Sequence, residues 1–182
     1  MHSKLSTVRP KLSADPCVIF ESRALYQISG PVRLSDEIEP PGRARLHRSG
    51  TDAVVVTWGT QVSAALEAAE TMKQEGLNVG VLDLRWLSPL DEDALRAAAR
   101  NASGRVIVAH EANRTGGFGA EIIARLHELL GDEATVRAIR VAAPDVRIPA
   151  APVLQRELLP TASWIIDAAR RLVSAGAESQ KL

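Results

Sequence analysis

The sequence predicts an α/β fold, with three αβα layers built around a mostly parallel sheet. From about residue 52, short apolar runs alternate with amphipathic runs, and the expected strands begin near residues 53, 79, 105 and 136. The resulting intervals, about 26 to 31 residues, suit βαβ crossovers, because hairpins need only a few connecting residues. The strands are apolar on both faces, which indicates that helices cover the sheet on both sides.

The first unit pairs the apolar run AVVVTW (53–58) with a helix that follows Gly59. Thr60 is placed to cap this helix, and Gly76 stands where a left-handed helix terminator belongs. Helical spacing predicts one apolar face on this helix. Its expected members are Val62, Ala65, Leu66, Ala69 and Met72.

Three further units follow in the same rhythm. VGVLDL (79–84) precedes a helix over 91–101, whose three leading acidic residues suit the positive end of the helix dipole. RVIVA (105–109) leads through a glycine loop into a helix, and VRAIRV (136–141) precedes the last helix, which follows Pro160. The residues expected to face inward are Phe118, Ile122, Leu126 and Leu129 in the third helix and Ile165, Ala168, Ala169 and Leu172 in the last.

The N-terminal part has a different organisation. GRARLHR (42–48) alternates Ala44 and Leu46 with basic residues, which predicts an edge strand with one wet face. CVIF (17–20) resembles an isolated buried strand, and a segment rich in Pro, Gly and charge follows it. We therefore expect a preceding element with a linker over 1–41, the α/β domain over 42–175 and a flexible tail over 176–182.

Composition excludes several classes of protein. The 182 residues include 22 Lys and Arg and 22 Asp and Glu, so neither the net charge nor a basic run indicates a nucleic-acid binder. No apolar stretch is long enough for a membrane span, and the N-terminus has no secretory h-region. Its basic and hydroxyl residues allow an organellar presequence as an alternative, but we expect a cytoplasmic protein. The single cysteine, Cys17, excludes an internal disulfide, and we expect it to be a buried thiol rather than a nucleophile.

The most distinctive stretch is HEANRTGGFGAE (110–121), at the carboxyl end of an expected strand. Gly116, Gly117 and Gly119 precede a helix, and with Arg114 their backbone amides could hold a phosphate or carboxylate. The alternative is that the glycines allow the helix to pack close to the sheet. The spacing matches neither the dinucleotide-binding fingerprint nor the P-loop.

His110 and Glu111 are the candidates for proton transfer in this stretch. Neighbouring residues of an extended segment point to opposite faces, so a structural pair that anchors the loop is the alternative. We expect His127, in mid-helix, to face solvent. No second His or Cys has metal-ligand spacing, so no metal site is expected, and no complete catalytic set is present.

Five motifs resemble, in register and over roughly residues 15–173, the beta subunit of thiamine-diphosphate-dependent 2-oxo acid dehydrogenases. They are DPCVIFESRALY, GTDAVVVTWGTQVSAALEAAE, DLRWLSPLD, HEANRTGGFGAEI and APDVRIPAAPVLQRELLP. The resemblance implies the transketolase C-terminal fold, with five strands of which the first is antiparallel. It also implies that residues 1–41 end a pyrimidine-binding domain. Asn113 replaces a proline and Gln155 a glutamate of the family pattern.

The resemblance further implies membership of an α2β2 component that decarboxylates pyruvate or a branched-chain 2-oxo acid and acylates a lipoyl group. Thiamine diphosphate and Mg²⁺ would lie between the alpha subunit and the pyrimidine-binding domain, so we expect this chain alone to bind neither and to be inactive. Its partners would be those two parts and the lipoyl acyltransferase. A non-catalytic docking module and a sensor of small anions or nucleotides remain the alternatives.

The segment VRIPAAPVLQRELLP (146–160) has three prolines and many apolar residues but no regular period. On a monomer it would expose an apolar patch, so either it covers the domain's own edge or it contacts a second copy. Leu154 and Leu158 are four residues apart, which permits a short helical turn with one shared face. We expect a two-fold homodimer through these leucines.

Overall fold

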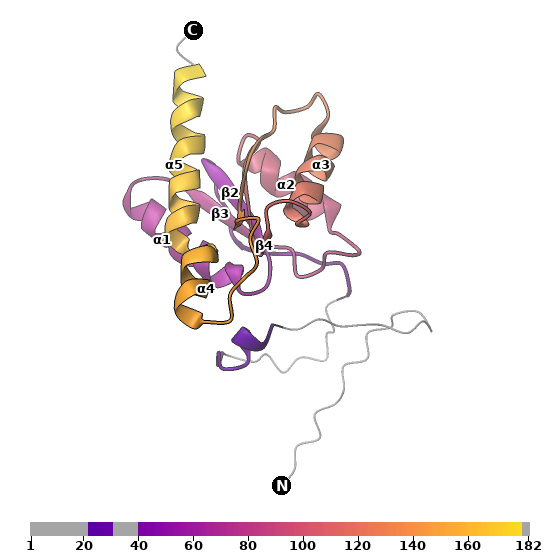
Figure 1. Cartoon of the computed structure of the whole chain (residues 1–182). Helices are drawn as coiled ribbons and strands as arrows, with labels where there is room; N and C mark the ends of the chain where they lie inside the picture. The colour runs from indigo at the N-terminus through magenta and orange to yellow at the C-terminus, as the bar shows by residue number, and fades with distance from the viewer. Residues whose placement is uncertain (1–21, 31–39, 180–182) are drawn as a thin grey trace.

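The computed structural model describes residues 22–30 and 40–179, and a five-stranded sheet lies at its centre (Figure 1). The strands lie in the order β1-β3-β2-β4-β5, with β1 antiparallel to β3 and all other pairs parallel. This topology confirms the predicted fold class and the antiparallel edge strand. The strands are β1 (Arg45–Arg48), β2 (Ala53–Thr57), β3 (Val79–Asp83), β4 (Arg105–Asn113) and β5 (Arg137–Ala143).

Helices cover both faces of the sheet, α1 and α5 on one and α2 and α3 on the other (Figure 1). A 3-10 turn, η1, precedes the sheet. The helices are η1 (Arg23–Leu25), α1 (Gln61–Gln74), α2 (Glu92–Asn101), α3 (Gly119–Leu130), α4 (Pro152–Leu158) and α5 (Ala162–Ser179). Helix α5 extends past the boundary predicted at residue 175. The expected strand at 17–20, with Cys17, lies outside the described residues.

The core consists of two apolar layers separated by the sheet. Val55 of β2 packs toward α1 and α5, whereas Val54 and Val56 pack toward α2 and α3, and all three are at most 1% exposed. The hydroxyl of Thr57, also fully buried, donates to the carbonyl of Ala109 at 2.9 Å. The central strand is therefore buried on both faces, as its unbroken apolar run predicts.

Helix α1 buries most of the predicted face, including Ala65, Ala69 and Met72, but not Leu66. Ala68 is buried with Ala65, Ala69 and Met72, whereas Leu66 is 37% exposed. The buried alanines bring α5 close to α1, so small residues rather than Leu66 form the contact. The expected cap by Thr60 is also wrong, because its side chain forms no capping hydrogen bond. Gly76, with φ of 82°, ends the helix as predicted.

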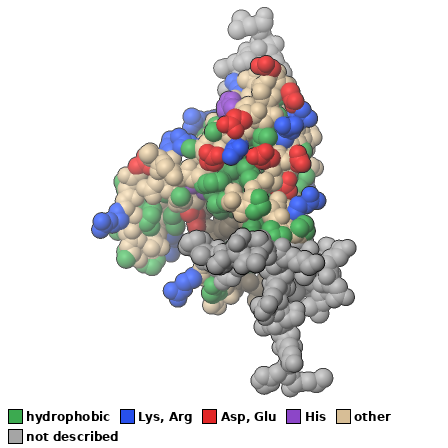
Figure 2. Space-filling model, turned by 90° about the vertical axis from the view of Figure 1, so that its right-hand side faces the viewer, with side chains coloured by type: hydrophobic (Ala, Val, Ile, Leu, Met, Phe, Trp, Pro, Cys, Tyr) green, Lys and Arg blue, Asp and Glu red, His purple; other side chains and the backbone are tan. Residues whose placement is uncertain are grey.

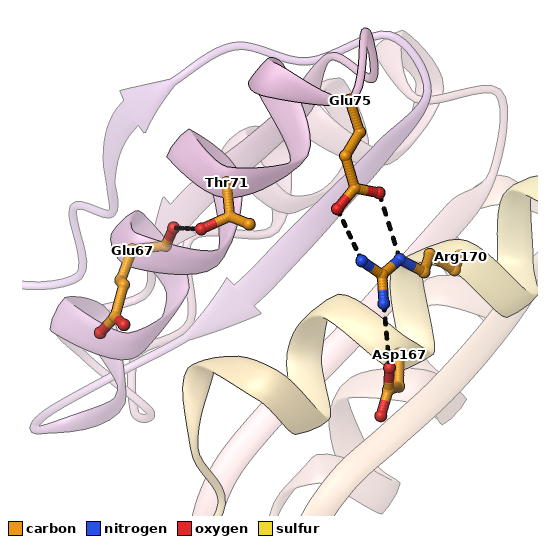
Figure 3. A network of polar contacts seen from close by, with 5 residues as sticks. All are labelled: Glu67, Thr71, Glu75, Asp167 and Arg170. Atoms are coloured by element: carbon orange, nitrogen blue, oxygen red, sulfur yellow. Dashed lines mark hydrogen bonds and ion pairs between the residues drawn. The ribbon is translucent and has the colours of Figure 1, made fainter.

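An exposed ion-pair network ties the end of α1 to α5 (Figure 3). Both carboxylate oxygens of Glu75 accept from Arg170, at 2.6 and 3.1 Å, and Asp167 lies 3.4 Å from the same guanidinium. The Arg170 hydrogen bond lowers the pKa of Glu75 below its usual value. Two arginine donors on one carboxylate fix the geometry of the contact more strictly than a single bond would.

The N-terminus of α2 holds the edge strand in place. One oxygen of Asp91 accepts from the Ala94 amide at 3.1 Å and caps the helix, and the other accepts from the Ala44 amide at 3.0 Å. The expectation that Leu46 faces the core is wrong, because its side chain is 53% exposed. The side chains of α2 opposite it are alanines, which leave a shallow cavity of about 360 Å³ at this edge.

Candidate functional site

The segment predicted to carry chemistry lies where β4 gives way to α3. Strand β4 continues through Asn113, with an irregularity in pairing after His110, so the first four residues of the expected loop are in the strand. The remaining turn leads to Gly119, the first residue of α3, and includes Gly116 with φ of 73°. That left-handed conformation favours glycine, which explains this one residue of the glycine cluster.

His110 is buried in the layer between the sheet and α3. Its side chain is 1% exposed and stacks on Trp58, with ring centroids 5.4 Å apart and planes 11° apart. Trp58 in turn contacts Phe118 edge to face, at 6.2 Å. Neither ring nitrogen of His110 is in hydrogen-bond geometry with any described residue. His110 is thus an aromatic element of the core.

Burial lowers the pKa of His110 below its usual value, and the nearby charge of Arg140 lowers it further. A weaker backbone interaction with Ala112 opposes the shift. Both main causes disfavour the imidazolium form, so the ring is neutral at neutral pH. A neutral, enclosed imidazole is poorly placed to exchange protons with a substrate in solvent.

Glu111 does not join His110 in a common site. It is exposed, whereas His110 is buried, because the two side chains leave an extended strand in opposite directions. An acid–base pair acting on one substrate is therefore excluded, as the alternation of the strand predicts. The structure also shows no hydrogen bond between the two side chains.

Two of the three glycines serve close packing. A Cβ atom on Gly117 would lie 2.6 Å from Cε1 of His110 and would also overlap the Asn113 carbonyl. A Cβ atom on Gly119 would overlap Nε2 and Cδ2 of the same His110 ring and would lie 3.3 Å from Val108. The start of α3 therefore rests directly on the imidazole, which supports the packing interpretation of these glycines.

Arg114 points away from the glycine turn, toward strand β5. Its Nη2 donates to the carbonyl of Arg140 at 3.3 Å, and Nη1 of Arg140 donates to the carbonyl of Arg114 at 2.8 Å. The sequence-based expectation that Arg114 and the glycines form one anion cradle is not met by this arrangement. The side chain of Arg114 instead crosses the edge of the sheet.

Several hydrogen bonds, which the sequence motif did not predict, join the turn to the segment after β5. Thr115 donates to Asp145 from its amide at 2.8 Å and from its hydroxyl at 2.7 Å. These bonds lower the pKa of the Asp145 carboxyl below its usual value. Asn113 donates to the carbonyls of Pro144 and Val146, at 3.0 and 3.2 Å. An amide in place of the family's proline gives the Asn-Arg-Thr sequence this extra connection.

On its other side the glycine turn borders a cavity of about 650 Å³ that also reaches α2 and α3. The only described cation in its lining is Arg125, which pairs with Glu121 at 3.0 Å, Glu92 at 3.5 Å and Glu128 at 3.7 Å. Figure 2, viewed from the side of α2 and α3, shows acidic and basic side chains interspersed on this face. Because Arg125 is already surrounded by carboxylates, this cavity does not favour an anion.

No group of three or more His, Cys, Asp or Glu side chains in the described ranges is arranged to hold a metal ion. Within the same ranges, no helix combines the length and apolar character that a membrane span requires. His127 is exposed on α3, as expected.

The segment predicted to form an interface contains the short helix α4. Pro152 occupies its first turn, where a proline is tolerated, so the segment is more regular than its composition predicted. Leu154 is 54% exposed, and Val146 and Val153 are also exposed, whereas Leu158 is half-buried. The four-residue spacing does give a helical turn, but only Leu154 of the predicted pair is fully presented to solvent.

This sheet order and these motifs agree with a match of residues 42–165 to the family model for the transketolase C-terminal domain. The chain belongs to that family. The matched residues include the whole sheet and reach into helix α5. Family membership confirms the predicted fold and the predicted resemblance.

The relatives include proteins named as beta subunits of an oxidoreductase and of a dehydrogenase. The chain is 36% identical over 160 residues to the 3-methyl-2-oxobutanoate dehydrogenase subunit beta of Mycobacterium tuberculosis, covering 87% of the chain and 45% of that protein. It is 33% identical over 162 residues to the acetoin:2,6-dichlorophenolindophenol oxidoreductase subunit beta of Cupriavidus necator, covering 89% of the chain and 48% of that protein. The chain thus spans a little under half the length of these relatives.

A solved structure shares the arrangement in space. It is described as a split-gene transketolase in an inactive beta4 tetramer, and it is 28% identical with a TM-score of 0.65. The match covers 79% of this chain and 46% of that one. The similarity extends over most of the transketolase C-terminal domain described above.

Proposed function

We propose that these residues form the C-terminal domain of the beta subunit of a thiamine-diphosphate-dependent 2-oxo acid dehydrogenase. That component oxidatively decarboxylates a 2-oxo acid and transfers the acyl group to a lipoyl group. The supporting observation is the match to beta subunits over 87% and 89% of this chain, although it spans less than half of each relative. Because these relatives differ in substrate, the 2-oxo acid is left open.

Within this proposal, the domain contributes to subunit assembly and supplies no catalytic residue. The candidate acid, Glu111, and the candidate base, His110, lie on opposite faces of β4, and His110 is enclosed. The described residues also fit Mg²⁺ poorly, since they hold no cluster of carboxylate or imidazole ligands. Thiamine diphosphate and Mg²⁺ would therefore be held by the alpha subunit and the pyrimidine-binding domain.

We expect the isolated chain to bind no thiamine diphosphate and to decarboxylate no 2-oxo acid. The reason is the lack of metal ligands among the described residues, because the diphosphate is recognised through its Mg²⁺. Titration calorimetry with thiamine diphosphate and Mg²⁺, alongside a control titration with Mg²⁺ alone, measures this directly. Micromolar cofactor binding by the 182-residue chain would contradict the proposal.

The surface of α4 is the proposed contact with a second copy. Val146, Val153 and Leu154 are 48%, 61% and 54% exposed, and all three are large apolar residues close together in the chain. Burying them between two copies would remove apolar area from water, and a two-fold contact is the commonest closed arrangement. The described self-association of the split-gene transketolase as a beta4 tetramer supports this part of the proposal.

Leu154→Asp is expected to convert the dimer to a monomer, because it places a charge at the centre of the apolar surface. Sedimentation equilibrium at tens of micromolar distinguishes the species by mass, and circular dichroism checks that the fold is retained. Leu46→Asp is the matched control, because Leu46 is 53% exposed on the distant strand β1. A 19.5 kDa monomer for the unmodified chain would refute the dimer.

Mixing experiments test the assembly role. The chain is combined with an alpha subunit and a pyrimidine-domain fragment of a related 2-oxo acid dehydrogenase, and masses are measured before and after. A larger complex with decarboxylase activity supports the proposed function. A complex without activity would favour a non-catalytic docking module, and addition of the lipoyl acyltransferase then tests whether docking is retained.

A further inference from the structure

Three arginines lie beside β5, the strand at one edge of the sheet, in a hollow separate from the cavity lined by Arg125. Arg114 from the turn, Arg140 from β5 and Arg171 from α5 line one pocket, with a volume of about 200 Å³. We call this hollow the β5–α5 pocket. Its lining also includes Trp164 and Asp167 of α5.

The positive charge of this pocket is not balanced by ion pairs. None of the three arginines lies within 4.0 Å of a carboxylate oxygen in the described part of the chain, and the side chain of Arg171 forms no hydrogen bond there. Arg114 and Arg140 donate to each other's backbone carbonyls, which fixes their guanidinium groups without forming an ion pair. An arginine has five N–H donors, so donors remain for a ligand.

Two carboxylates lie close to the pocket, and both have other partners. Asp167 pairs with Arg170 at 3.4 Å. Asp145 accepts two hydrogen bonds from Thr115, although the charges of Arg114 and Arg140 do act on it. The lining itself therefore carries three cations and one anion, in a chain whose charges balance overall at 22 of each sign.

We propose that the β5–α5 pocket binds the phosphate group of a small phosphorylated molecule. A phosphate offers several oxygens at a charge near −2, which suits a pocket lined by three arginines better than a single carboxylate does. Trp164 is 37% exposed at the same pocket, so its indole offers a flat apolar surface to a planar group attached to the phosphate. None of the residues that line the pocket belongs to α4, and the proposal does not depend on the dehydrogenase function.

Binding is tested with inorganic phosphate, AMP and adenosine as probes, by calorimetry on the full chain at low salt. We expect millimolar binding of phosphate, and AMP to bind more tightly by roughly tenfold because stacking adds to the charge contacts. Adenosine, which lacks the phosphate, should not bind measurably. Affinity for AMP should fall as salt is raised, since the contacts are ionic.

Arg171→Gln is expected to weaken AMP binding by about tenfold or more, because it removes a charge-assisted contact. Since the side chain of Arg171 forms no hydrogen bond to the described residues, this change should leave the fold intact, which circular dichroism and the denaturation midpoint verify. Arg43→Gln, at an exposed position just before β1 and so beside the opposite edge of the sheet, is the matched control and should leave affinity unchanged. Trp164→Ala should remove the advantage of AMP over phosphate while leaving phosphate binding in place.

Three outcomes would overturn the proposal. Failure of both phosphate and AMP to bind at about 10 mM would exclude a phosphate-binding site of millimolar affinity. Equal loss of affinity in Arg171→Gln and Arg43→Gln would show only general charge attraction. If the natural chain does not bind phosphate and Arg171→Gln changes the mass measured by sedimentation, the pocket is a contact between protein chains instead.

Discussion

Replacing Gly119 with alanine is expected to destabilise the domain by roughly 2–3 kcal/mol, near the upper end of the usual cost of overpacking. The added methyl group would overlap the His110 ring and lie 3.3 Å from Val108, and neither neighbour has room to move. Trp58 stacks on the imidazole and Val108 belongs to a buried strand, so both are held by the core. Chemical denaturation with linear extrapolation measures the free energy of unfolding.

A control at a neighbouring glycine separates packing from backbone strain. Gly116 has open space where a methyl group would be added but a φ of 73°, so Gly116→Ala should cost only about 1 kcal/mol. Gly117→Ala should cost more than Gly116→Ala, because its methyl group would lie 2.6 Å from His110. Equal effects at all three glycines would contradict a packing role and would point to a general property of the turn.

A double-mutant cycle with His110 tests the contact itself. His110→Ala removes the ring that the new methyl group would overlap, so Gly119→Ala should cost clearly less in that background than in the natural one. The coupling should be about 1 kcal/mol or more, as expected for residues in direct contact. If the two changes in unfolding free energy are strictly additive, the cost of Gly119→Ala does not come from contact with the His110 ring.

The sheet could be predicted from sequence because its physical signals are local. Apolar runs at crossover spacing give parallel strands, and Asp91 and Gly76 mark helix ends through groups within a few residues. The predictions of which side chains are buried were wrong where burial depends on a neighbour far along the chain. Leu46 is exposed because α2 opposes it with alanines, and Ala68 replaces Leu66 because α5 packs on small residues.

The same reason limits prediction of the candidate site. The motif placed Arg114 beside three glycines, but its direction depends on the carbonyl of Arg140, 26 residues away. The β5–α5 pocket combines residues from β5, the glycine turn and α5, so no local motif could reveal it. Alternation along a strand, by contrast, was sufficient to separate His110 from Glu111.

Acidification from pH 7 to pH 5 is expected to destabilise the domain through His110. Its native pKa is lowered by burial and by Arg140, so below the usual imidazole pKa of 6.5 the unfolded chain binds a proton that the native ring does not. Stability is therefore complete above that value and is lost as the pH falls toward the native pKa. The loss can approach about 1.4 kcal/mol per pH unit for one proton.

The measurement is the free energy of unfolding at several pH values between 5 and 7, for the natural chain, His110→Gln and His127→Gln. His127 is exposed on α3, so its replacement should leave the pH dependence unchanged. His110→Gln should flatten the curve even though it lowers stability at every pH, because glutamine does not titrate while the stacking on Trp58 is lost. Curves that stay parallel for the natural chain and His110→Gln would show that the ring can accept a proton while buried.

A Trp58→Leu variant then tests whether burial or the charge of Arg140 lowers the pKa of His110. Trp58 covers one side of the imidazole, and the start of α3 lies directly against it. If this enclosure excludes water from the ring, opening the Trp58 side should raise the native pKa toward 6.5 and reduce the acid sensitivity. An acid sensitivity unchanged from that of the natural chain would instead assign the shift to the charge of Arg140, which the substitution leaves in place.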